Sequence, residues 1–166
     1  DSKVRFFMRD SISPYDITTF PHPGFMTDWQ GPWAVLMSQA EGISLIHETI
    51  YESRFGYVSE LEKMGARLEL FSPKVKKPHL FYNFNYSEHE NGVKQAVKIH
   101  GKTKLHNAVL YITDLRAGAT LVLAALTSYG KSVIFGVEHL ERGYEDFDLR
   151  LRRLGANIKT YEEHYK

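Results

Sequence analysis

The chain has 166 residues, of which 43% are hydrophobic and 13% aromatic, a composition typical of one packed globular domain rather than a disordered chain. Its 21 Lys and Arg residues nearly balance 20 Asp and Glu residues, giving a net charge of +1, so the basic surface expected of a nucleic-acid-binding protein is missing. Cysteine is absent, which excludes disulfides, cysteine–zinc sites and a cysteine nucleophile within these residues.

The first 71 residues are predicted to alternate strands with helices. We expect strands at residues 4–8, 16–20, 43–51 and 67–71, and helices at residues 29–40 and 57–64. Residues 21–25 hold two prolines and a glycine, which predict a loop of defined shape. Thr27 and Asp28 are candidate caps for the first helix, and Gly42 and Gly65 are candidate helix stops.

Residues 73–94 depart from this alternation, with two prolines and an aromatic run at residues 80–86. Alternating Phe and Tyr favour a pleated surface, so we expect a surface excursion with some strand content. Lys74, Lys76 and Lys77 indicate a solvated face rather than a nucleic-acid patch. Strands are expected again at residues 95–100 and 105–112, followed by a helix–strand–helix stretch at residues 113–156.

No apolar run approaches the roughly 18 residues that span a bilayer, and the N-terminus lacks the apolar core of a signal peptide. We therefore expect a soluble, cytoplasmic protein without a membrane partner. The eight histidines form no metal-ligand spacing, so we expect neither a metal ion nor a cofactor.

Residues 27–66 and 113–156 repeat the same punctuation. Thr-Asp opens both stretches, Gly-Ala closes both, and Arg54 follows Gly42 at the same interval as Arg142 follows Gly130. Self-similarity at this spacing predicts one supersecondary unit used twice. Each unit is expected to run strand, helix, strand, helix and two further strands, which gives an α+β fold of repeated βαβαββ units.

Three arginines are predicted near helix starts: Arg54, Arg116 and Arg142. The helix dipole opposes a cation there, whereas free backbone N–H groups and guanidinium groups together suit a phosphate or carboxylate ligand. The structural alternative is that each arginine pairs with a neighbouring carboxylate, from Glu52, Asp114 or Glu141. For Asp114 itself a simple helix-capping role is the competing interpretation.

Six blocks of sequence, taken together, resemble the UDP-N-acetylglucosamine 1-carboxyvinyltransferases, the enolpyruvyl transferases of the first committed step of peptidoglycan synthesis. The blocks are residues 21–30, 40–42, 48–55, 64–66, 113–118 and 142–145, which read Pro-His-Pro-Gly-Phe-Met-Thr-Asp-Trp-Gln, Ala-Glu-Gly, Glu-Thr-Ile-Tyr-Glu-Ser-Arg-Phe, Met-Gly-Ala, Thr-Asp-Leu-Arg-Ala-Gly and Arg-Gly-Tyr-Glu. Their order and spacing cover the chain from about residue 19 to residue 158. The second of the longer blocks speaks against the sister family that makes 5-enolpyruvylshikimate 3-phosphate.

The resemblance implies two similar domains, each an inside-out α/β barrel of three such units, with the active site in the cleft between them. The chain then looks like a single partial domain from the C-terminal part, with repeats at about residues 1–72 and 95–166 and an excursion at about residues 73–94. The implied reaction transfers enolpyruvyl from phosphoenolpyruvate to the 3-hydroxyl of UDP-N-acetylglucosamine and releases phosphate. The implied partner is the missing N-terminal region or second domain.

The resemblance also implies roles for individual residues. Asp28 matches the carboxylate that contacts the sugar 3-hydroxyl and is proposed to take its proton. Arg54, Arg116 and Arg142 match arginines that hold phosphoenolpyruvate, Arg142 being counted with Asp28 as catalytic, and Asp114 matches an active-site acid. Ile50 and Tyr51 match positions near the nucleotide, where an aromatic ring can pack on uracil.

The chain departs from the family pattern in three respects. The catalytic loop with its cysteine and the lysine–asparagine pair belong to regions outside these residues, the excursion is longer than the family leads us to expect, and Gly31-Pro32-Trp33 replaces a more polar helix start. These residues alone are therefore expected to be inactive. The alternative is a non-catalytic binding or scaffold module that kept the fold.

Overall fold

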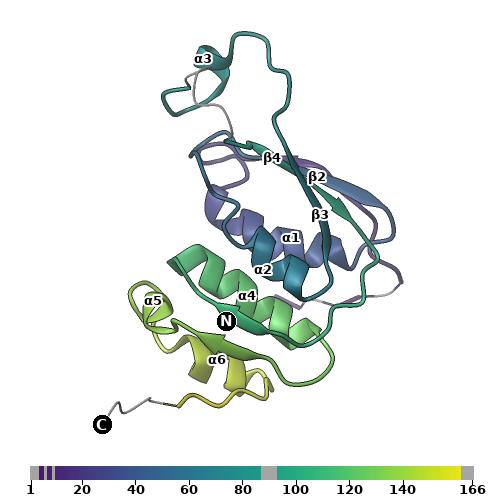
Figure 1. Ribbon diagram of the computed structural model, residues 1–166, viewed down its shortest axis with the longest axis vertical. Helices are drawn as coiled ribbons and strands as arrows, with labels where there is room; N and C mark the ends of the chain where they lie inside the picture. Colours follow the sequence, from purple (N-terminus) through teal and green to yellow (C-terminus); the bar gives the residue numbers. More distant parts are fainter. Residues whose placement is uncertain (1–3, 6, 9, 87–92, 162–166) are drawn as a thin grey trace.

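The computed structural model describes residues 4–5, 7–8, 10–86 and 93–161 (Figure 1). Its elements alternate as the sequence predicts. In chain order they are β1 (Ile17–Thr18), the 3-10 helix η1 (Thr27–Trp29), α1 (Gln30–Ser38), β2 (Ile43–His47), α2 (Val58–Lys63), β3 (Arg67–Phe71), α3 (Pro78–Phe81), β4 (Ala96–His100), β5 (Val109–Tyr111), α4 (Leu115–Thr127), β6 (Val133–Phe135), α5 (Glu138–Glu141) and α6 (Phe147–Arg153). None of the described helices is long and apolar enough to cross a membrane.

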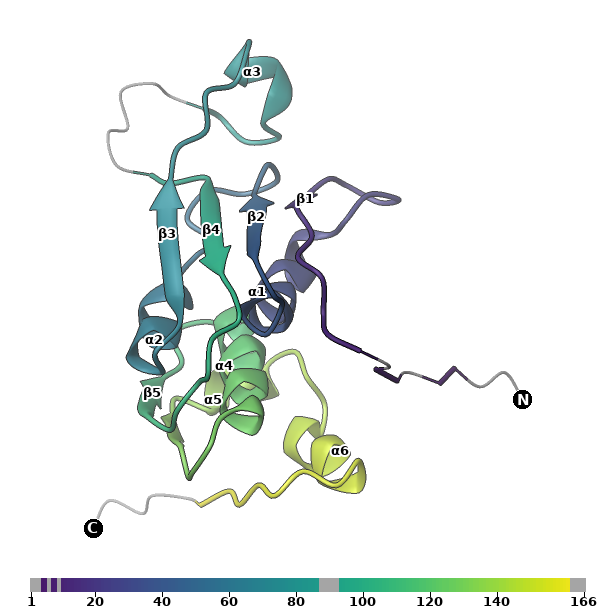
Figure 2. The same ribbon diagram turned by 90° about the vertical axis from the view of Figure 1, so that its right-hand side faces the viewer.

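The first half of the chain builds a four-stranded sheet in the order β1-β2-β4-β3 (Figure 2). β1 pairs with β2 in parallel, while β4 runs antiparallel to both β2 and β3. One face of the sheet is apolar: Ile46, Val97 and Leu68 alternate with polar neighbours and are buried beneath α1 and α2. The other face carries Glu69, which pairs with Lys98 and His100.

The second half forms a parallel pair, β5-β6, with α4, α5 and α6. Figure 1 shows α1 and α4 lying between the two sheets. One continuous core joins the halves, running from Ile17 in β1 to Leu140 in α5. The helices therefore hold the two sheets together as one body.

α1 and α4 pack closely because small residues face each other. Gly31 lies against Thr120, where any side chain at position 31 would overlap the threonine hydroxyl. This contact sets the start of α1 beside the start of α4. The two ends that the sequence repeat makes equivalent are thus neighbours in space.

The predicted helix stops are confirmed. Gly42, Gly65, Gly130 and Gly155 all adopt positive φ, between 89° and 145°, directly after the helices that they end. The inside-out barrel and the number of its units stay predictions.

Three predicted elements of the first half differ from the structure. The described residues of the expected strand at 4–8 form no strand, while residue 6 lies outside the described residues. Neither Thr27 nor Asp28 caps a helix, because Thr27 donates its hydroxyl proton to Glu48 and Asp28 pairs with Arg116. The strand expected at 43–51 ends at His47, because the next residues turn around the Glu48 carboxylate.

The strand that we expected to open the second repeat, residues 95–100, instead completes the first sheet. Val97 and Ile99 are buried on the same face as Ile46 and Leu68, so this strand finds its partners there. The excursion therefore interrupts the first unit between β3 and β4. Its described part contains the short helix α3 and no strand, contrary to our expectation of strand content.

Candidate functional site at the start of helix α4

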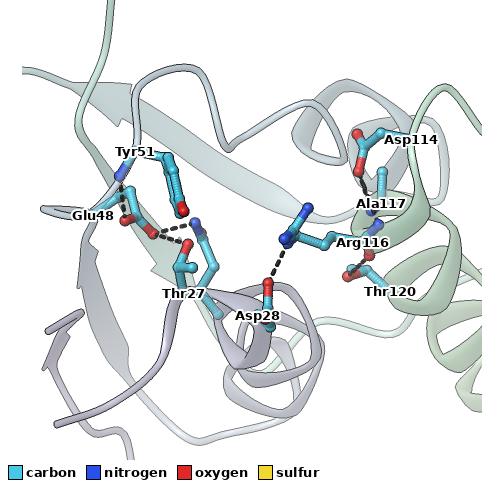
Figure 3. Close-up of polar contacts among 9 residues, drawn as sticks. Thr27, Asp28, Glu48, Tyr51, Asp114, Arg116, Ala117 and Thr120 are labelled. Atoms are coloured by element: carbon cyan, nitrogen blue, oxygen red, sulfur yellow. Dashed lines mark hydrogen bonds and ion pairs between the residues drawn. The ribbon is translucent and has the colours of Figure 1, made fainter. Parts of the chain in front are cut away.

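Asp114 caps helix α4, as the capping interpretation predicted. Its Oδ1 atom accepts hydrogen bonds from the backbone N–H groups of Arg116 and Ala117, both at 2.9 Å (Figure 3). These bonds satisfy two of the N–H groups that a helix start leaves free. The second oxygen, Oδ2, remains available on the side that faces the 54–57 loop, since a Cβ atom at Gly56 would lie 3.6 Å from it.

Arg116 points from the first turn of α4 toward Asp28 in η1, and its Nε–H donates to Asp28 Oδ1 (Figure 3). The pair joins residues 88 positions apart in the chain. The Arg116 and Asp28 side chains are 39% and 51% exposed, so a ligand can reach both. Arg116 thus has a carboxylate partner, but it is Asp28 rather than the neighbouring Asp114 that we had considered.

Arg54 lies in the loop before α2, three residues short of the turn that starts the helix. Its guanidinium carbon stacks 4.2 Å from the centre of the Tyr51 ring. Within the described part of the chain Arg54 makes no ion pair, so its hydrogen-bonding edge is open to an anion. The loop that carries Arg54 is the one whose Gly56 faces Asp114.

Arg142 follows α5 rather than preceding a helix, which corrects the position expected from the sequence. The short helix α5 intervenes between β6 and this arginine, and the sequence gave no separate signal for it. The next residue, Gly143, packs against Leu115, the first residue of α4, where an added Cβ would lie 2.6 Å from Leu115 Cδ2. Arg142 is therefore also held beside the start of α4, without an ion pair to any described residue.

All three arginines and both aspartates thus gather around the first turn of α4, although they come from four separate segments. Asp28 arrives with η1, Arg54 with the loop before α2, and Arg142 with the end of α5. The cationic side chains outnumber the carboxylates, and the helix start adds its positive end. Such a surface suits a ligand with phosphate or carboxylate groups.

Ile50 and Tyr51 lie in the loop after β2, and a buried carboxylate fixes their backbone. Glu48 is fully buried, and its Oε1 atom accepts hydrogen bonds from the N–H groups of Ile50 and Tyr51 at 2.7 and 3.1 Å (Figure 3). Thr19, Thr27 and Gln30 donate three more bonds to its two oxygens, at 2.7–2.9 Å. The network links this loop to η1, which carries Asp28.

Sequence reasoning did not identify Glu48 as a functional residue. A carboxylate at the end of an apolar strand, three residues before Tyr51 and within a polar block, was the available signal, but the sequence does not show that Thr19, Thr27 and Gln30 converge on it. Burial and the Glu48 charge also raise the pKa of the Tyr57 phenol, whose hydroxyl donates to Gln30 at 3.1 Å. Tyr57 therefore stays protonated and acts as a donor.

No group of His, Asp or Glu side chains in the described part of the chain is arranged to hold a metal ion. The residues around the start of α4 offer guanidinium and backbone N–H donors, which hold anions directly.

Comparison with known proteins matches residues 2–151 to the family model described as EPSP synthase (3-phosphoshikimate 1-carboxyvinyltransferase). A protein of Chlamydia muridarum named UDP-N-acetylglucosamine 1-carboxyvinyltransferase is 47% identical over 145 residues, covering 87% of this chain and 31% of that protein. A protein of Caldanaerobacter subterraneus subsp. tengcongensis, named UDP-N-acetylglucosamine 1-carboxyvinyltransferase 3, is 38% identical over 163 residues, covering 98% of this chain and 34% of its own length.

Among solved structures, the enolpyruvyl transferase NikO from Streptomyces tendae superposes with a TM-score of 0.72 at 31% identity. The match covers 92% of this chain and 30% of NikO. The chain thus spans about a third of the length of the relatives that it matches.

Proposed function

We propose, from the premise that this chain belongs to the EPSP synthase family of carboxyvinyl transferases, that it forms one wall of an enolpyruvyl transferase site. The donor substrate is phosphoenolpyruvate and the acceptor is the 3-hydroxyl of UDP-N-acetylglucosamine. The observation that carries this proposal is the convergence of Asp28, Arg54, Asp114, Arg116 and Arg142 around the first turn of α4.

Asp28 is the proposed general base. Its carboxylate is half exposed, so a sugar hydroxyl can come within hydrogen-bond distance and give up its proton there. Arg116 holds Asp28 in place in the ligand-free chain, and this guanidinium group can turn to the anionic donor when both substrates are bound. Asp28 then faces the hydroxyl while Arg116 faces the donor.

The arginines are the proposed electrostatic component of the site. The leaving phosphate gains charge as its bond to the enolpyruvyl carbon breaks, and fixed guanidinium groups stabilise that charge. Arg142, which makes no ion pair within the described residues, is the proposed catalytic member because its charge is not already offset. Arg54 and Arg116 bind the same donor, and Ile50 and Tyr51 bind the nucleotide of the acceptor.

We further propose that the other wall of the site comes from the parts of the relatives that this chain does not cover, and that the reaction belongs to cytoplasmic peptidoglycan synthesis. The relatives are about three times as long as the aligned region, which leaves ample sequence for a second domain. The 166 residues alone are accordingly expected to bind ligand but not to turn it over.

The experiment combines this chain with a polypeptide carrying the uncovered remainder of the Chlamydia muridarum relative, and follows phosphate release from phosphoenolpyruvate with UDP-N-acetylglucosamine. We expect release only when both polypeptides and both substrates are present. Asp28→Asn should reduce the rate by about 100-fold or more, the usual range for a general base. Glu62→Gln, on the exposed surface of α2, is the matched control and should leave the rate unchanged. Equal rates for the two variants would refute the role of Asp28.

The scaffold alternative makes the opposite forecast for the isolated chain. If calorimetry detects no affinity of the chain for UDP-N-acetylglucosamine or phosphoenolpyruvate, and the combined polypeptides release no phosphate, then the fold has been kept without the chemistry.

A further inference from the structure

The Thr49–Tyr51 loop is held on its inner side by Glu48. As described above, the buried carboxylate accepts the N–H groups of Ile50 and Tyr51 and three side-chain donors. Thr49 adds a bond from its own N–H group to the Thr19 hydroxyl at 2.8 Å. The inner side of this loop is therefore satisfied by groups of the main fold.

The outer side of the same loop is held by the excursion. The backbone N–H of Asn83 donates to the carbonyl of Thr49 at 2.7 Å, and the Asn83 side-chain amide approaches the same oxygen at 3.4 Å. Without Asn83, the Thr49 carbonyl would have to find water or another donor. The excursion thus supplies a backbone bond to the loop that carries the proposed nucleotide-binding residues.

Aromatic packing holds Asn83 in this position. Tyr82 is 94% buried, being 6% exposed, and its hydroxyl lies 3.0 Å from His47 Nε2 at the end of β2. The Tyr82 ring stacks on Tyr86 at 4.8 Å, while the Phe81 ring packs 5.2 Å from His47. Burial raises the pKa of Tyr82 to about 12, so the phenol keeps its proton. These contacts are those of a docked segment, in contrast to Leu80, which is 73% exposed.

We propose that the docked part of the excursion, residues 81–86, is a positioning element of the acceptor site: it clamps the Thr49–Tyr51 loop against Glu48 and so pre-forms the surface that binds the nucleotide sugar. The inference rests on the proposed function, since that function assigns Ile50 and Tyr51 to the nucleotide. A loop ordered before binding spares the ligand the entropic cost of ordering it. Removing the clamp lowers the fraction of chains whose loop is competent, and the apparent affinity falls by the same factor.

The test compares Tyr82→Ala with Leu80→Ala in the 166-residue chain. Tyr82→Ala removes the ring that docks Asn83, while Leu80→Ala shortens an exposed side chain in the same helix. Amide hydrogen exchange of Ile50 and Tyr51, measured by NMR, reports on the loop without any ligand. Calorimetry with UDP-N-acetylglucosamine and with phosphoenolpyruvate reports on binding.

We expect Tyr82→Ala to speed exchange of both amides by on the order of tenfold and to weaken UDP-N-acetylglucosamine binding by a similar factor. Phosphoenolpyruvate binding, assigned to the arginines, should not change. Leu80→Ala should match the wild type in all three measurements. Tyr82→Phe keeps the ring and loses only the bond to His47, so it should recover most of the affinity; it also serves if Tyr82→Ala does not fold.

Equal exchange rates in Tyr82→Ala and Leu80→Ala would overturn the inference whatever the ligand. So would faster exchange with unchanged affinity for UDP-N-acetylglucosamine, because the loop would then be clamped without serving the ligand. A wild-type chain that binds no UDP-N-acetylglucosamine refutes the proposed function and with it the acceptor-site role, although faster exchange in Tyr82→Ala alone would still establish the clamp.

Discussion

Glu48 is a buried carboxylate that its neighbours satisfy with hydrogen bonds instead of a cation. No Lys or Arg of the described chain pairs with it, yet five donors converge on its two oxygens. Bonds to a charged acceptor are stronger than neutral ones, and together they offset the loss of hydration. Its position between η1 and the loop after β2 makes it the junction between Asp28 and Tyr51.

Replacing Glu48 by Gln should destabilise the chain by about 3 kcal/mol. The amide keeps the shape but turns an NH₂ group toward hydroxyl and N–H donors, so buried donors lose their acceptor. Urea unfolding measures the effect. Glu52→Gln, four residues further on and exposed, should stay within about 0.5 kcal/mol of the wild type. If both substitutions had the same small effect, the network would not stabilise the fold.

Asp114 and Asp28 are predicted to differ in what they do for stability, although the sequence repeat aligns them. Asp114→Ala removes the cap of α4 and should lower stability by about 1 kcal/mol, whereas Asp114→Ser should restore most of it. Asp28→Ala removes only an exposed ion pair and should change stability by less than about 0.5 kcal/mol. Thermal unfolding of the three variants checks this ranking, and a larger loss for Asp28→Ala would contradict it.

His47 should make the chain less stable as the pH falls below the ordinary histidine value of 6.5. Desolvation lowers the pKa of His47, while the nearby Glu48 charge opposes the shift. The unfolded chain therefore takes up a proton before the folded chain does, so stability is complete above pH 6.5 and declines as the pH falls toward the folded value. Urea unfolding between pH 8 and pH 5 should show a shallower decline for His47→Gln than for the wild type. Parallel curves would exclude His47 as the source.

At the scale of elements, the contact between α1 and α4 decides where the site residues meet. Because Gly31 sits against Thr120, the helix starts that carry Asp28 and Arg116 come within ion-pair distance. Glycine is needed here for close approach, since its φ is not positive. Small residues at such a crossing let two helix backbones come closer than side chains would allow.

Gly31→Ala should therefore destabilise the chain by about 1–3 kcal/mol, because the new methyl group overlaps the Thr120 hydroxyl and α1 must move away from α4. In the double variant Gly31→Ala/Thr120→Ala part of this loss should be recovered, since the clashing hydroxyl is gone. A double-mutant cycle in urea quantifies the coupling. Strictly additive effects would mean that the two residues do not share the contact.

The local signals of the sequence predicted most elements but not their partners. Gly42, Gly65 and Gly130 marked real helix ends, and β3 lies at the predicted residues 67–71, because such features depend on neighbouring residues alone. The sheet that contains β4 is decided by which buried face it completes, and no local pattern encodes that. The aromatic run of the excursion failed as a strand signal for the same reason, since its rings pack on His47 instead of pairing in a sheet.

At the scale of the whole molecule, the repeat explains both the likeness and the difference between the two halves. After Gly65 the chain enters β3, which pairs with β4, whereas residues 156–161 after Gly155 pair with no strand of the described chain. A strand without a neighbour has no ladder of hydrogen bonds to hold it. The convergence of Asp28, Arg54 and Arg142 could not be derived from spacing, because it depends on how the two halves pack.

The continuous core predicts that the two halves unfold together. Buried residues run without a break from the first sheet through α1 and α4 to α5, so neither half keeps its apolar surface covered alone. Trp29 and Trp33 lie in η1 and α1, and their fluorescence reports on the first half, while far-ultraviolet circular dichroism also includes α4 and α6. The two urea transitions should coincide in the wild type. They should separate in Gly31→Ala, where the helix contact that joins the halves is weakened, with the fluorescence midpoint shifting relative to the dichroism midpoint. Separate transitions in the wild type would show that the halves are independent, and the gathering of site residues around α4 would then depend on a partner domain.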